Sequence, residues 1–135
     1  MMFVSTGLVN YSPRLIGNSD EKWWLVLQCG SEIGKYYRRL YDYLTNNCRK
    51  IQAPGWKDHI TIGRNEKPPD EFQSLWGKYE GLEVEFEYNS VPRTNGQYYW
   101  LDVKCDWLLD LREELGLPRE PEFKLHLTIG NNINL

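Results

Sequence analysis

Histidine and cysteine are both scarce in this chain of 135 residues, and neither occurs at a spacing typical of a metal site. The three cysteines, Cys29, Cys48 and Cys105, are an odd number without a CxxC pair. Neither a disulfide framework nor a zinc knuckle is therefore indicated. Unpaired cysteines are typical of a reducing compartment, so we expect a cytoplasmic protein.

The sequence also lacks a long apolar run and an excess of positive charge. No apolar stretch approaches the length that crosses a membrane, and the first residues lack the charged and apolar regions of a signal peptide. The formal net charge is -3 and the pI is about 5.4, which argues against a broad basic surface for long nucleic acid. We expect no membrane partner and no long double-stranded nucleic acid, whereas a small anion held by a few cations stays compatible.

Two stretches of ten residues nearly repeat each other, and together they contain both histidines of the chain. Residues 56–65 and 123–132 are identical at six of ten aligned positions. Their alternation of apolar and polar residues predicts half-buried strands. One polar face then presents Lys57, His59 and Thr61, and its counterpart presents the matching set. The matching set is Lys124, His126 and Thr128, and the apolar residues expected to face the core are Ile60, Ile62, Leu125, Leu127 and Ile129.

The rest of the chain predicts a single α+β domain that spans residues 1–135. The predicted elements are a strand at 3–9, a strand at 23–29, a helix from Ser31 to Asn46-Asn47, a helix from Pro69 to Gly81, a strand at 82–88, a hairpin turn at Asn95-Gly96, a strand at 97–105 and a helix from Asp106 to Gly116. Residues 1–22 are an N-terminal extension and 23–130 the core. Since the two histidines are 67 residues apart, about half the chain, we expect two lobes that face each other across a cleft.

Charged residues elsewhere predict solvated faces. Lys35, Arg38 and Arg39 occupy one side of the first predicted helix and are interpreted as a solvent-facing surface. The acidic residues that alternate along 82–88 are interpreted as the wet side of an antiparallel sheet.

The histidine strands carry the groups that phosphodiester cleavage needs. A base must take a proton from the attacking oxygen and an acid must supply one to the leaving oxygen, and two imidazoles that titrate near pH 6.5 can do both. Thr61 and Thr128 can donate hydrogen bonds to a phosphate oxygen. Lys57 and Lys124 can add positive charge. Which histidine is the base and which is the acid stays open.

The paired His-x-Thr motifs, on strands half a small chain apart, resemble the two-histidine (2H) phosphoesterase superfamily, which includes LigT-like RNA cyclic phosphodiesterases and phage enzymes that degrade cyclic nucleotide signals. The resemblance extends from Trp23 to Gly130. It implies a bilobal fold of two antiparallel sheets around a central cleft with helices packed outside. It also implies a catalytic pair, His59 and His126, two phosphate-binding hydroxyls, Thr61 and Thr128, and no metal or other cofactor. The expected enzyme is a phosphodiesterase acting on a cyclic or internucleotide bond of a small nucleotide or RNA end, as a monomer in the cytoplasm, or the host cytoplasm if phage-encoded.

Several alternatives remain at this stage. The histidines could be structural, or could ligate zinc with Asp58 or Asp102, although Asp58 should face away from His59 on its strand. The protein could sequester a nucleotide without cleaving it, or join RNA ends in the reverse direction. For base stacking, the candidate rings are Tyr98, Trp100 and Tyr11.

Overall fold

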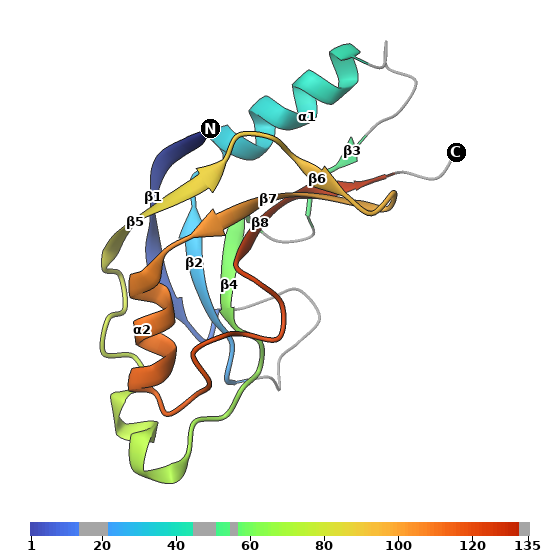
Figure 1. Cartoon of the computed structure of the whole chain (residues 1–135). Coiled ribbons are helices and arrows are strands. Elements are labelled where there is room, and N and C mark those ends of the chain that lie inside the picture. The colour runs from blue at the N-terminus through green and yellow to red at the C-terminus, as the bar shows by residue number, and fades with distance from the viewer. Residues whose placement is uncertain (14–21, 45–50, 55–56, 133–135) are drawn as a thin grey trace.

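The structure is a computed structural model that describes residues 1–13, 22–44, 51–54 and 57–132, and antiparallel sheet dominates it (Figure 1). Its elements are β1 (Met2–Tyr11), β2 (Leu25–Cys29), α1 (Glu32–Leu44), β3 (Ile51–Gln52), β4 (His59–Gly63), η1 (Asp70–Leu75), β5 (Glu83–Asn89), β6 (Arg93–Thr94), β7 (Tyr98–Lys104), α2 (Asp106–Glu114) and β8 (His126–Asn132). The strands form one sheet in the order β3-β8-β4-β2-β1-β5-β7-β6. A further pairing of β7 with β8 closes six strands into a barrel, to which β3 and β6 add.

The predicted α+β class is confirmed, whereas the expected pair of separate sheets is not. The first strand explains the difference. Residues 1–22 were expected to lie outside the core, but β1 pairs with β2 on one side and with β5 on the other. This strand joins the two halves of the chain into one sheet. The apolar residues of β1 are not all buried, since Val9 and Tyr11 lie in the core while Met2, Phe3 and Val4 are exposed. The hydrophobic pattern alone therefore did not assign this strand to the core.

The barrel is filled by the inward side chains of its strands. The apolar residues predicted to face the core on the two histidine strands are all buried, which confirms the face assignment. Burying one such Leu or Ile side chain contributes roughly 1.5–3 kcal/mol. Helix α2 adds Leu108, Leu111 and Leu115 to this core. In the view of Figure 1, α1 crosses the top of the sheet and α2 lies at its lower left.

Two helical predictions changed. The segment after Pro69 forms only the short 3-10 helix η1, none of whose residues is buried, and Gly77 then turns the chain with a φ of 90°. In α1, Lys35 and Arg39 are exposed as predicted, but Arg38 is not part of a solvated face. Its Nη1 donates to the carbonyl of Ile129 at 2.7 Å, so it joins α1 to β8.

Some predictions lie outside the described residues. These are residues 14–21 of the N-terminal extension, the helix end at Asn46-Asn47, Cys48, and the start of the first histidine strand at Trp56. In the described part of the chain, no helix is long and apolar enough to cross a membrane.

Candidate active site

The two histidine strands are neighbours in the sheet and do not face each other across a cleft as expected. Strands β4 and β8 pair antiparallel with Ile60 opposite Leu127. One step along each strand in opposite directions brings His59 beside Thr128, and Thr61 beside His126. Each imidazole therefore lies next to the hydroxyl of the other motif.

The adjoining strands β2 and β7 add neighbours to each His–Thr pair, so two rows of side chains run across the strands on the outer face of the barrel. On one side, β2 pairs with β4 so that Gln28 lies opposite His59. On the other, β7 pairs with β8 so that Trp100 lies opposite Thr128 and Asp102 lies opposite His126. A register shift between Tyr99 and Trp100 interrupts β7 next to the site. Such bulges redirect side chains, and they are frequent beside active sites.

Both imidazoles are oriented by the same contact. Nδ1 of His59 lies 2.7 Å from the carbonyl oxygen of Lys57, and Nδ1 of His126 lies 2.7 Å from that of Lys124. A carbonyl can only accept, so Nδ1 carries the proton and donates it in both rings. In the neutral form this tautomer puts the lone pair on Nε2, the nitrogen suited to exchange a proton with a ligand.

The surroundings of His59 change its affinity for a proton. Burial lowers the pKa of His59 below its usual 6.5, and Arg64 and His126 lower it further, against opposing contributions from the Lys57 carbonyl and Asp58. His59 is thus favoured as the neutral imidazole near pH 7. Asp58 is buried at 7% exposure and lies under Gly34 of α1, which agrees with its predicted direction away from His59. Burial raises its pKa, although Arg38, 3.7 Å away, lowers it.

Two cavities meet at His126. The smaller has a volume of about 120 Å³ and is also lined by Thr61 and Arg64. The larger is a groove of about 740 Å³ that is also lined by Thr128 and Arg64. Thr61 and Thr128 therefore line different cavities, whereas His126, Arg64 and Phe123 line both. His59 lines neither of the two cavities.

The structure brings most of the predicted contact residues to the groove. Tyr98, Trp100 and Lys124 line it, and the Trp100 Nε1 donates to Asp102 at 3.2 Å. Lys57 contributes its carbonyl to His59, while its side chain is exposed and lines neither cavity.

Tyr11 does not lie at the site. It is buried at 8% exposure in the core, where its ring packs against Trp76 at 5.1 Å. Its hydroxyl accepts a hydrogen bond from the Tyr79 amide at 3.4 Å, and burial raises its pKa to about 12.

Sequence reasoning missed Arg64, which directly follows β4. Its guanidinium lies over two rings, 5.4 Å from the centre of Trp24 and 5.2 Å from that of Phe123. The aligned residue of the second repeat is Asn131, so a difference between the two copies was the available signal.

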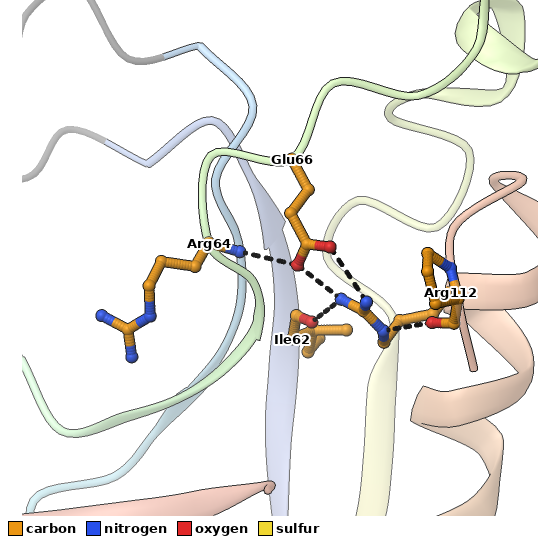
Figure 2. A network of polar contacts seen from close by, with 5 residues as sticks. Ile62, Arg64, Glu66 and Arg112 are labelled. Carbon is orange, nitrogen blue, oxygen red and sulfur yellow. Dashed lines mark hydrogen bonds and ion pairs between the residues drawn. The ribbon is translucent and has the colours of Figure 1, made fainter. Parts of the chain in front are cut away.

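Sequence reasoning also missed Arg112, whose contacts hold the segment around Arg64 (Figure 2). Arg112 of α2 is 1% exposed and pairs with Glu66 through both carboxylate oxygens, at 2.7 and 3.0 Å. It also donates to the carbonyls of Ile62 and Pro118, each at 2.8 Å. Arg112 is the one arginine in a helix whose other residues are apolar or acidic, and this gives no pattern that predicts the contact.

The groove is positively charged in a protein of net charge -3. Arg64, Arg93 and Lys124 line it against a single carboxylate, Asp102. That carboxylate lies 3.1 Å from Arg93 and partly neutralises it. A cluster of cations in a groove attracts anions locally whatever the overall charge.

Within the described ranges, no group of three or more His, Cys, Asp or Glu side chains is placed to hold a metal ion. Cys29 and Cys105 are buried and free, and burial raises the pKa of both thiols, that of Cys29 to about 12. Searches against family models, curated proteins and solved structures found no match to this chain.

Proposed function

We propose that the protein is a metal-independent phosphodiesterase of the 2H phosphoesterase superfamily that cleaves a cyclic or internucleotide bond of a small nucleotide or RNA end. One observation supports this most strongly. Two imidazoles on neighbouring strands have the same tautomer, fixed by the same carbonyl contact at 2.7 Å, and each lies beside the threonine of the other motif. One of the two imidazoles, that of His126, also lines the cationic groove.

In this proposal the two histidines divide the proton transfers. His59, whose pKa is lowered, is the general base that takes the proton from the attacking water or hydroxyl through Nε2. His126 in its protonated form donates to the leaving oxygen. Thr61 and Thr128 donate hydrogen bonds to the non-bridging phosphate oxygens, where negative charge grows in the transition state.

The groove suits a nucleotide better than an isolated phosphate. Its volume of about 740 Å³ lies within the range of small-molecule sites, about 300–1,000 Å³. Tyr98 is 52% exposed and stands on the same wall as Trp100, so both rings can stack on a base next to the scissile phosphate. The resemblance implies two candidate substrates, a 2′,3′-cyclic RNA end and a cyclic oligonucleotide.

The bilobal division belongs to the same proposal. The repeat supports it because each half of the chain supplies one histidine strand, 67 residues apart in sequence. A monomer acting in the cytoplasm is also part of this proposal.

The test is hydrolysis of a panel of 2′,3′-cyclic nucleotides, cyclic dinucleotides, cyclic oligonucleotides and RNA with 2′,3′-cyclic ends, in excess chelator. We expect one class to be opened by the wild type, and His59→Ala and His126→Ala each to lose nearly all turnover while folding normally. Thr61→Val and Thr128→Val keep the side-chain shape and remove the hydroxyl, so we expect a partial loss.

Each alternative gives a different result in this panel. A ligand that binds and is recovered intact identifies a sequestering protein. Joining of RNA ends identifies a ligase. Activity that the chelator abolishes identifies a metal enzyme, and full activity in either histidine variant refutes the mechanism.

A further inference from the structure

We propose that Arg64 binds the substrate's anionic group between the two histidine motifs, and that Arg112 is its positioning residue. The inference rests on the proposed function in one respect only, namely that the ligand is a phosphate ester. Nothing in the repeated motifs assigns a role to either arginine, because Arg64 is aligned with Asn131 and Arg112 lies outside both copies.

Arg64 is the cation that both cavities share. It lines the smaller cavity together with Thr61 and His126, and the groove together with Thr128 and His126. A phosphate held between the two threonines would occupy the border of the two cavities, to which Arg64 contributes. Arg93 and Lys124 line the groove alone, so neither of them spans the site.

The guanidinium of Arg64 is available for an anion. In the described ranges no carboxylate lies within ion-pair distance of it, whereas Arg93 is already paired with Asp102. Its described neighbours are ring faces, at 5.4 Å for Trp24 and 5.2 Å for Phe123. Stacking on rings fixes the plane of a guanidinium and leaves its edge N–H groups to bind two phosphate oxygens at once.

Arg112 fixes the backbone on either side of Arg64. It holds the Ile62 carbonyl two residues before Arg64 and the Glu66 carboxylate two residues after it. Glu66 in turn accepts a hydrogen bond from the Arg64 amide at 3.4 Å. We call the contacts of Arg112 with Ile62 and Glu66 the clamp. Figure 2 shows that the Arg64 side chain extends away from Arg112 and Glu66, so the clamp positions the backbone of this segment and does not bind the Arg64 guanidinium.

The same residue also fixes one of the rings. The Nε of Arg112 donates to the Pro118 carbonyl at 2.8 Å, in the loop that leads to Phe123. A single buried side chain thus ties together the segment that carries Arg64 and the loop that carries a ring against which it lies. Loss of the clamp should widen the range of Arg64 positions and weaken anion binding.

The experiment is titration with inorganic phosphate, followed by the NMR signal of the Arg64 Nε–Hε group and assigned with Arg64→Lys. We expect phosphate to shift this signal. Arg64→Met should weaken phosphate binding about tenfold or more, as expected for the loss of a bidentate charged contact, and Arg64→Lys should weaken it less. Arg119→Lys is the matched control, since Arg119 pairs with Asp110 and Glu113 and lines neither cavity.

The positioning role is tested by combining variants. Arg112→Lys keeps the charge but loses the planar fork that holds Glu66 and two carbonyls, so it should weaken phosphate binding about threefold to tenfold, a coupling of the size found for neighbouring residues. In an Arg64→Met background, Arg112→Lys should have no further effect, because Arg112 acts through Arg64. A merely structural clamp predicts the same loss in both backgrounds.

These results separate the inference from the proposed function. Phosphate binding that is unchanged in Arg64→Met overturns the inference, even if cyclic nucleotides are hydrolysed. Weaker phosphate binding in Arg64→Met, with no hydrolysis of any nucleotide in the panel, supports the anion site and refutes the proposed phosphodiesterase activity. Equal losses from Arg112→Lys in both backgrounds remove Arg112 from the inference and leave Arg64.

Discussion

Replacing Arg112 by Met tests how much stability the clamp supplies. Methionine keeps an unbranched side chain of similar length, so the core position stays filled. It removes both bonds to Glu66 and those to the carbonyls of Ile62 and Pro118. Breaking a buried ion pair by removing one partner costs roughly 3–5 kcal/mol. Because the Glu66 side chain is 31% exposed and can be partly rehydrated, we expect the lower end, about 3 kcal/mol.

The assay is urea unfolding followed by tryptophan fluorescence at pH 7. A loss of about 3 kcal/mol is a large part of the roughly 5–15 kcal/mol that stabilises a domain, so the variant should still fold. Its thermal midpoint should fall by about 10 °C for a domain of this size. A loss below about 1 kcal/mol would mean that the four contacts contribute no more than one ordinary hydrogen bond, and would refute the reasoning.

The same pair predicts how this loss depends on pH. Hydrogen bonds from Arg112 lower the pKa of Glu66 below its usual 4.5. The ionised pair therefore stabilises the fold fully above pH 4.5, and this contribution is lost as the pH falls through the lowered pKa of the folded state. The difference between the wild type and Arg112→Met should shrink in acid. A difference that is the same at pH 7 and pH 3 contradicts the assignment to this pair.

Three further predictions concern the site and its support. Burial lowers the pKa of His59, so the folded state binds fewer protons than the unfolded one and stability should fall as the pH drops below 6.5; urea unfolding of His59→Gln should show a flatter slope between pH 7 and 5. Tyr98→Ala should raise the KM for a cleaved nucleotide about tenfold through lost stacking, while substitution of Tyr36 by Ala, at an exposed position on α1, should leave the KM unchanged. Gly34→Ala should lower the free energy of unfolding by roughly 1–3 kcal/mol, measured by calorimetry, because a Cβ there would collide with Asp58.

The local sequence pattern was sufficient to predict which side chains point into the core where one face of a strand is buried and the other is polar. In β4 and β8, Ile60 and Leu127 point into the barrel and the histidines point out, as alternation predicted. The Asn95-Gly96 turn also formed, because the Asn95 side chain accepts from the amides of Gln97 and Tyr98, and Gly96 adopts a φ of 95°. Such features depend on residues close together in the chain.

Closure of the sheet depends on contacts that no local pattern contains. The pairing of Asp102 with His126, and of Gly7 with both Cys29 and Val84, joins segments that are far apart in sequence. The repeat therefore predicted the two motifs correctly but not their relation, since a duplicated strand can face its copy or lie beside it. Arg112 was missed for the same reason, because Glu66 and Ile62 lie 46 and 50 residues away from it in the sequence.

The relation between the copies explains why two nearly identical motifs need not do the same chemistry. Antiparallel pairing around Ile60 and Leu127 makes the two motifs equivalent by a local two-fold axis, and a symmetric pair could not favour one histidine as base. The neighbours on either side break that symmetry, because His59 lies opposite Gln28 whereas His126 lies opposite Asp102. Arg64 has no cationic counterpart after the second motif, and it lowers the pKa of His59. Replacing Arg64 by Asn makes the two copies alike at this position, and it should bring the pKa of His59 closer to 6.5, which an NMR titration of the imidazole can measure.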